Sequence, residues 1–195
     1  MSAPAFADPV FQSQATFRAV LEAMSRPGRI VSCGAGLAPP APLSLAAAAI
    51  LLTLCDYETP LWLSPAYATS EVGAWARFHT GAPAAPTPDR AAFALIDLSK
   101  DTLDLSRFAQ GAPDFPDRST TIVAEVATLA ATGPLQLKGP GVKGVASLGL
   151  APLPADFLAQ WLANGAGFPL GVDMIFTAEA RAAAFPRSTR VSGAA

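Results

Sequence analysis

The stretch Val172-Asp173-Met174-Ile175-Phe176-Thr177 has the composition of a buried strand, being rich in apolar, β-branched and aromatic residues. Phe168-Pro169-Leu170-Gly171 precedes it, and Phe185-Pro186-Arg187-Ser188-Thr189 closes the segment. A carboxylate on such a strand must lie at its rim or accept hydrogen bonds from a cation or from backbone N–H groups. We therefore expect Asp173 to be partnered by Arg187, at the start of the next extended piece. The pair either holds two strands together or binds a ligand.

Strands alternate with helices along the rest of the chain. The patterns predict strands at Arg29–Cys33, Pro60–Leu63, Ala92–Asp97 and Thr120–Val126, and a hairpin of Leu135–Lys138 with Val145–Leu148. They predict a first helix from Asp8-Pro9 to Arg26-Pro27-Gly28, and further helices at Leu43–Cys55, Ser70–Thr80, Asp101–Phe108 and Pro154–Leu162. This order indicates an α/β fold, with a layered mixed sheet and helices on both of its faces. We expect one domain over residues 1–195, with flexible tails at about 1–8 and 192–195.

Composition excludes several classes of protein. Of the 195 residues, 51% are hydrophobic and 14% are charged, which argues against a disordered chain. The formal net charge of −2 provides no basic footprint for nucleic acid. The first residues show no secretory signal, and the apolar run Leu43–Cys55 is shorter than the ~20 residues that a membrane span needs. We expect a cytoplasmic protein with neither nucleic acid nor membrane as a partner.

Candidate catalytic and metal-binding residues are few. His79 is the only histidine, so a multi-histidine metal site is excluded, and we expect no metal. His79 falls at a helix C-terminus, where it either caps the helix or binds a ligand. Cys33 and Cys55 have no zinc-binding spacing and are expected to be reduced core residues. Asp56 and Glu58 either end a helix or form a carboxylate pair for acid–base chemistry.

The segment Gly139-Pro140-Gly141-Val142-Lys143-Gly144 satisfies the GxGxxG pattern of dinucleotide-binding folds, but its context differs. A strand rather than a helix is predicted after it, and Pro140 removes one amide donor. We interpret it as a turn between two strands. The alternative is a backbone nest that binds a phosphate together with Lys138 and Lys143.

The ordered set of motifs resembles the PhnH family of the bacterial carbon–phosphorus lyase system. The matching segments are Phe17-Arg18, Ala23-Met24-Ser25-Arg26-Pro27-Gly28, Leu51-Leu52-Thr53-Leu54-Cys55-Asp56, Thr59-Pro60-Leu61-Trp62-Leu63, Arg77-Phe78-His79-Thr80, Leu137 with Gly139-Pro140-Gly141-Val142, Phe168-Pro169-Leu170-Gly171-Val172-Asp173 and Pro186-Arg187-Ser188-Thr189. The resemblance covers about Phe11 to Val191. Pro116-Asp117-Arg118-Ser119-Thr120 departs from the family pattern, so it implies no role for that loop.

The resemblance implies an accessory subunit in phosphonate catabolism. It implies action with the PhnG, PhnI and PhnL subunits to make alpha-D-ribose 1-methylphosphonate 5-triphosphate from ATP and an alkylphosphonate, before PhnJ cleaves the carbon–phosphorus bond. It also implies a homodimer when isolated, and a fold similar to the large domain of pyridoxal-phosphate transferases without the cofactor. No established catalytic residue carries over from the family.

Two alternatives stay open. The first is a ligand- or nucleotide-binding catalytic subunit that uses Arg77, His79, Asp173 and Arg187 in a cleft. The second is a pyridoxal-phosphate enzyme, which needs a Schiff-base lysine. The chain offers only Lys100, Lys138 and Lys143, none in a motif for that role, and we expect no cofactor.

Overall fold

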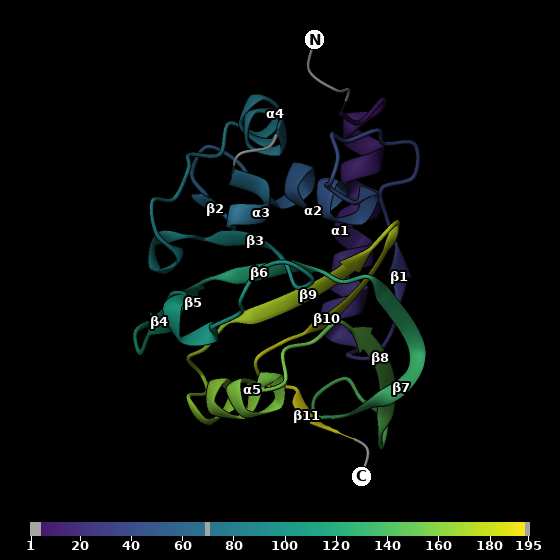
Figure 1. The fold of residues 1–195 in the computed structure, drawn as a ribbon. Helices are drawn as coiled ribbons and strands as arrows, with labels where there is room; N and C mark the ends of the chain where they lie inside the picture. The colour runs from purple at the N-terminus through teal and green to yellow at the C-terminus, as the bar shows by residue number, and fades with distance from the viewer. Residues whose placement is uncertain (1–4, 69–70, 194–195) are drawn as a thin grey trace.

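The computed structural model describes residues 5–68 and 71–193 and has a six-stranded mixed sheet at its centre (Figure 1). The helices are α1 (Pro9–Ser25), α2 (Leu45–Leu54), α3 (Pro65–Ala68), α4 (Glu71–Thr80) and α5 (Phe157–Ala166), with 3₁₀ turns η1 (Pro88–Arg90) and η2 (Leu105–Arg107). The strands are β1 (Val31–Ser32), β2 (Leu61–Leu63), β3 (Phe93–Asp97), β4 (Gln110–Ala112), β5 (Phe115–Ser119), β6 (Thr121–Glu125), β7 (Thr128–Lys138), β8 (Ala146–Ala151), β9 (Asp173–Ala178), β10 (Arg181–Phe185) and β11 (Arg190–Gly193).

The central sheet has the order β1-β10-β9-β6-β3-β2. Strands β2, β3, β6 and β9 are parallel, and β10 and β1 extend the sheet antiparallel to β9 and β10 respectively. A second sheet has the order β11-β7-β8, and β4 pairs with β5 alone. Helices α1 to α4 lie on one face of the central sheet, and α5 with the second sheet lies on the other (Figure 1). The molecule is thus built in three layers.

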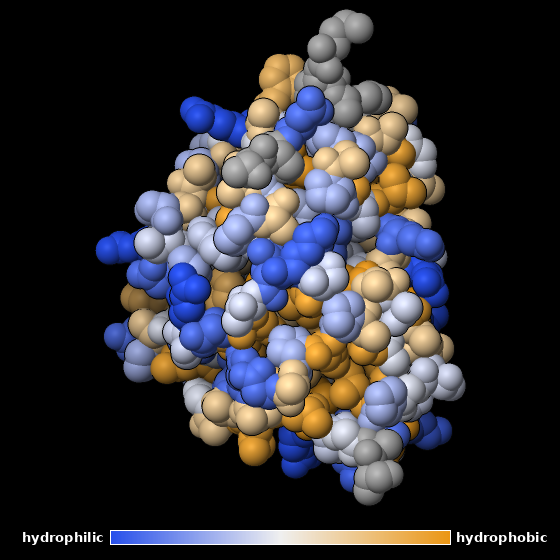
Figure 2. Space-filling view, in the orientation of Figure 1, coloured by the Kyte–Doolittle hydropathy of each residue, from blue (hydrophilic) through white to orange (hydrophobic). Residues whose placement is uncertain are grey.

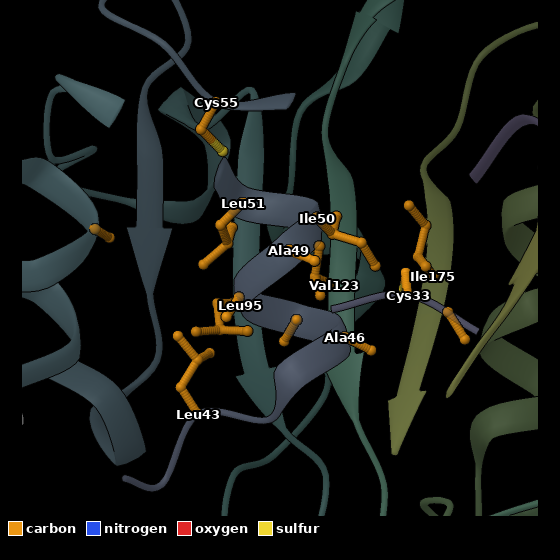
Figure 3. Packing of buried hydrophobic residues seen from close by; sticks show 14 of the residues in the cluster. Cys33, Leu43, Ala46, Ala49, Ile50, Leu51, Cys55, Leu95, Val123 and Ile175 are labelled. Atoms are coloured by element: carbon orange, nitrogen blue, oxygen red, sulfur yellow. The ribbon is translucent and has the colours of Figure 1, made fainter. Parts of the chain in front are cut away.

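Alternating residues of the central strands divide between two hydrophobic clusters. Leu95, Val123 and Ile175 point to the helical face and belong to the cluster with α2 (Figure 3). Their sequence neighbours Ile96 and Phe176 belong to the cluster under α5 and the second sheet. Because both faces are covered, these strands need apolar residues at every position rather than at alternate ones.

Helix α2 explains the apolar run that resembles a short membrane segment. Its N-cap is Ser44, whose side-chain oxygen accepts a hydrogen bond from the Ala47 N–H at 3.2 Å. Residues 46–51 are all buried, between the central sheet and the helices α1 and α4. Within the described residues, no helix is long and apolar enough to cross a membrane.

The predicted strands at Pro60–Leu63, Ala92–Asp97, Thr120–Val126 and Val172–Thr177 are confirmed to within one residue at each end. The prediction of a helix over Asp101–Phe108 is wrong, because only the η2 turn forms there. Asp101 accepts hydrogen bonds from Ser64 Oγ and the Asp97 N–H, and Asp104 accepts one from the Ser106 N–H. Side chains that bond to nearby backbone in this way compete with helical hydrogen bonding.

Three further details differ from the sequence predictions. The hairpin strands are longer than predicted and form a separate sheet in which β7 also pairs with β11, and this sheet shares one face of the central sheet with α5. Strand β10, with its Ala182–Ala184 run, was not predicted, since alanine favours helices. Arg187 lies in the turn between β10 and β11 rather than at the start of a strand.

The predicted helix and tails fall partly outside the described residues. Helix α4 is described from Glu71, and Ser70 lies outside the description. At the N-terminus, the Asp8 side chain accepts a hydrogen bond from the Phe11 N–H and so caps α1. At the other end, Ser192 and Gly193 pair with Gln136 and Leu135 of β7.

The buried thiols predict a fall in stability at alkaline pH. Cys33 and Cys55 are unpaired and buried, and burial raises their pKa from 9.0 to about 11 and about 12, with Asp56 adding to the effect at Cys55. The unfolded chain releases these protons at lower pH than the folded protein. The free energy of unfolding should therefore decrease above pH 9, with a limiting slope of about 1.4 kcal/mol per pH unit for each thiol.

Urea unfolding at pH 8, 9 and 10 measures this slope. The Cys33→Ala/Cys55→Ala variant is the control and should show a flatter dependence over the same range. Equal slopes for the parent and the variant would contradict the assignment of the two thiols as the titrating groups.

Candidate functional site

The pairing of β9 with β10 brings Asp173 beside Arg187. Phe185 is opposite Met174, so Asp173 at the start of β9 lies next to the turn that follows β10. The Arg187 backbone N–H donates to Asp173 Oδ1 at 2.7 Å, and the guanidinium Nε and Nη2 donate to Oδ1 and Oδ2 at 3.2 and 2.5 Å. The two side chains are 14% and 16% exposed. Asp173 is thus partnered by both the cation and a backbone donor, as its sequence context predicts.

All five N–H groups of the Arg187 guanidinium have acceptors in the protein. Nη1 donates to the carbonyl oxygens of Pro116 at 2.9 Å and Pro169 at 3.2 Å, and Nη2 also donates to Ser119 Oγ. With the two bonds to Asp173, these account for every donor of the group. Arg187 therefore joins strand β5, the loop before β9 and the turn after β10. This arrangement supports the strand-holding interpretation of the pair.

Arg77 and His79 lie on α4, away from this pair. Arg77 is exposed and lines a pocket of about 600 Å³ between α4 and the edge strand β2, next to Trp62 and Leu63. In the sheet order, β2 and β9 are three strand spacings apart, which is about 14 Å. The structure thus brings Asp173 and Arg187 together and places Arg77 in a different pocket.

His79 packs its ring against two aromatic neighbours. Its centroid lies 5.1 Å from that of Trp75 and 4.9 Å from that of Phe78. At the helix end, Thr80 Oγ1 donates to the Ala76 carbonyl at 2.8 Å, and the Gly81 N–H donates to the Arg77 carbonyl. Gly81 has φ +74°, which is typical of the residue that ends a helix.

Sequence reasoning missed a polar network at the carboxyl ends of the parallel strands. Glu125, at the end of β6, accepts hydrogen bonds from the Ser44 N–H at 2.6 Å and from Tyr67 Oη at 2.7 Å. Burial, followed by the charge and hydrogen bond of Glu125, raises the pKa of Tyr67. Tyr67 therefore stays protonated and donates to the carboxylate. Through these two hydrogen bonds, the Glu125 carboxylate ties the N-terminus of α2 and the helix α3 to the central sheet.

Asp97 and Asp101 complete the network at the end of β3. Asp97 accepts from the Ser99 N–H and hydroxyl and from Lys100 Nζ at 2.6 Å. Burial alone would raise the pKa of Asp97, but the hydrogen bonds from Lys100 and Ser99 outweigh it and lower the pKa. Asp101 accepts from Ser64 Oγ, from the Ala66 N–H and from the Asp97 N–H.

The carboxyl ends of parallel strands are where open α/β sheets bind ligands. The sequence signal for this network was available, because Asp97 is the last residue of one predicted strand and Glu125 the last but one of the next. Here the carboxylates are occupied by donors of the protein itself. Within residues 5–68 and 71–193, no three His, Cys, Asp or Glu side chains are arranged to hold a metal ion.

The remaining motifs have structural roles. The segment Gly139–Gly144 forms the predicted turn, between β7 and β8. A Cβ on Gly141 would come within 1.9 Å of the Ser25 carbonyl oxygen, so the turn packs directly against the end of α1. A carbonyl oxygen at this position repels an anion, which argues against the phosphate nest. Asp56 and Glu58 are exposed beyond α2, and the Glu58 N–H donates to Asp56 Oδ1 in a local turn.

The Asp173 pair predicts a large loss of stability on substitution. Asp173→Ala should lower the free energy of unfolding by about 3 kcal/mol, because it leaves a largely buried guanidinium without its counter-charge. For a chain of this size, that corresponds to a fall of roughly 6–12 °C in the melting midpoint, measured by circular dichroism.

Asp89→Ala is the matched control, since Asp89 forms an exposed ion pair with Arg90. Its midpoint should equal that of the parent. An unchanged midpoint for Asp173→Ala as well would show that the pair contributes nothing to holding the strands.

Comparison with known proteins places these features in a family. The family model for the bacterial phosphonate metabolism protein PhnH matches residues 4–192. The alpha-D-ribose 1-methylphosphonate 5-triphosphate synthase subunit PhnH of Rhizobium meliloti (strain 1021) is 43% identical over 187 residues, covering 96% of this chain and 94% of that protein. The putative C-P lyase subunit protein HtxG of Stutzerimonas stutzeri is 25% identical over 181 residues, covering 93% and 86%. The chain therefore belongs to the PhnH family of bacterial phosphonate metabolism proteins.

Proposed function

We propose that this chain is an accessory subunit of the complex that makes alpha-D-ribose 1-methylphosphonate 5-triphosphate from ATP and an alkylphosphonate. The observation that carries the proposal is the 43% identity, across nearly the full length of both proteins, to a relative named as the PhnH subunit of that synthase. Its partners in the complex are the PhnG, PhnI, PhnJ and PhnL subunits, and its location is the cytoplasm.

The guanidinium of Arg187 and the carboxylates of the polar network already have hydrogen-bond partners within the protein, which supports an accessory role. The guanidinium of Arg187 has no donor left for a substrate, and Asp97, Asp101 and Glu125 accept hydrogen bonds from the protein. A catalytic acid, base or nucleophile needs access to the reacting atoms. Chemistry in the complex is accordingly assigned to the other subunits.

A catalytic subunit with its own ligand cleft is the second candidate. One observation favours it: Arg77 is exposed and lines a pocket of about 600 Å³. In this candidate, Arg77 would bind an anionic ligand in the pocket. His79, two residues further along α4, is not among the described residues that line the pocket, and neither are Asp173 and Arg187. The adenine-release experiment below separates the two candidates.

We further propose a fold similar to the large domain of pyridoxal-phosphate transferases, without the cofactor. The lysines do not fit an internal aldimine. The hydrogen bond that Lys100 donates to the Asp97 carboxylate raises the pKa of Lys100, whereas a Schiff-base lysine needs a lowered pKa. Lys138 and Lys143 are exposed on β7 and on the turn that follows it.

A homodimer of the isolated chain is supported by the outer face of α1. Val10, Phe17 and Leu21 are 75%, 47% and 51% exposed and recur at helical spacing, forming an apolar stripe. We predict that light scattering at micromolar concentration gives twice the 19.9 kDa mass of the chain. Leu21→Glu should shift the mass toward the monomer, because it would bury a charge at the contact. A parent protein that scatters as a monomer would contradict the dimer.

The proposed function predicts a growth phenotype without activity of the isolated chain. Deleting the gene should stop growth on methylphosphonate as the sole phosphorus source, while growth on phosphate continues. The purified chain with ATP and methylphosphonate should release no adenine until PhnG, PhnI and PhnL are added.

Complementation by the parent gene and by Arg77→Ala is the control. Both should restore growth if the chain is accessory. Adenine release by the isolated chain, lost in Arg77→Ala, would instead establish the catalytic candidate. Normal growth of the deletion strain on methylphosphonate would overturn the proposed function.

A further inference from the structure

An apolar groove of about 600 Å³ runs between α5 and the chain from Arg187 to Val191. Leu162 and Phe168 line it and are 74% and 62% exposed, although both are large apolar side chains. In the same layer, Figure 2 shows further apolar surface between α5 and strands β7 and β8, which do not line the groove. Exposed apolar residues clustered at a groove are typical of a surface that another chain covers.

Positive charge lies on the rim of this groove. Arg190 lines the groove, and its cross-strand partner in β7 is Lys138, which lies next to Arg190 and outside the groove lining. Both are exposed, and neither forms an ion pair with any of the residues that the structure describes. Among the residues that the structure describes, those that line the groove include no carboxylate. Like charges directly opposite each other on paired strands are unfavourable in the isolated chain. A negatively charged partner would remove this repulsion.

We propose that this groove binds an acidic segment of another subunit, with apolar side chains seated against Leu162 and Phe168 and carboxylates facing Arg190 and Lys138. This inference rests on the proposed function, which supplies the partner subunits. It adds which surface of this chain they contact and which kinds of residue they contribute. The charges steer the segment to the groove, and the apolar contacts supply most of the affinity.

A second copy of this chain fits the groove less well. An interface with two-fold symmetry centred on it would place Arg190 and Lys138 opposite their own copies. A small anion also fits less well, because the donors of the Arg187 guanidinium are occupied by acceptors of the protein. An extended groove with apolar walls and one basic rim favours an acidic polypeptide segment.

Two measurements on the full chain test the proposal, with a mixture of purified PhnG, PhnI, PhnJ and PhnL as the probe. In the first, a photo-crosslinking amino acid replaces Leu162 or, as the matched control, Phe78, which is equally exposed at 74% on α4. The crosslinker at position 162 should capture one of the subunits, and the crosslinker at position 78 should not.

The second measurement compares how strongly the subunits bind to two charge-reversed variants, one altered at the groove and one altered elsewhere by the same change in net charge. Lys138→Glu/Arg190→Glu should weaken binding to the subunits by ~10-fold or more, and Arg18→Glu/Arg90→Glu should leave it within about two-fold. Lys138→Glu alone provides a sharper readout. It should raise the melting midpoint of the isolated chain by about 1–3 °C, because the new carboxylate faces Arg190, yet it should weaken binding.

The outcomes separate this proposal from the proposed function. If the parent binds the subunits but the reversed variants bind equally and position 162 captures nothing, the groove assignment is wrong and the proposed function stands. If the parent binds none of the subunits, both are wrong. Weakened binding by the reversed variants, with melting midpoints no lower than that of the parent, supports the groove as the docking surface.

Discussion

Burial of the central strands on both faces is the constraint on which the rest of the structure depends. Helices cover one face of β3, β6 and β9, and α5 with the second sheet covers the other (Figure 1). A charged side chain inside these strands would lose its hydration on either face, at a cost of several kcal/mol unless it is paired. The charged residues of the strands accordingly stand at their ends: Asp173 begins β9, and Asp97 and Glu125 end β3 and β6.

At both ends of the sheet, these charges connect elements that are distant in sequence. Asp173 and Arg187 join the start of β9 to the turn after β10 and to strand β5. Glu125 accepts from the backbone where α2 begins, and a carboxylate at a helix N-terminus is also favoured by the helix dipole. The buried polar groups are therefore needed to position the layers, and their presence does not require a catalytic role. This is the physical basis for separating the proposed accessory function from chemistry in the chain itself.

The sequence predicts the parts of the fold that local pattern determines. Strands β3, β6 and β9 were predictable because two-sided burial gives continuous apolar runs, and the Asp173 pair was predictable because a carboxylate interrupts one of them. Strand β10 was not, since Ala182–Ala184 has helical propensity and becomes a strand only by pairing with β9. The joining of Glu125 to Tyr67 and Ser44 spans 58 and 81 residues, so no local pattern could predict it. The hypothesis of one cleft also required Arg77 to lie near Asp173. Arg77 lies beside β2 and Asp173 begins β9, and no local pattern indicates that two strands separate β2 from β9.

The two exposed apolar surfaces lie in different layers, which bears on how the chain can assemble. The stripe on α1 belongs to the helical layer, whereas the groove beside α5 lies across the central sheet from it (Figure 1). The stripe on α1 consists of apolar residues, which suits contact with an identical copy. The groove has basic residues at its rim, which suits a partner of opposite charge. A dimer formed through α1 would leave the groove open. Self-association and docking to another subunit are therefore compatible in the same molecule, each using the surface whose charge pattern permits it.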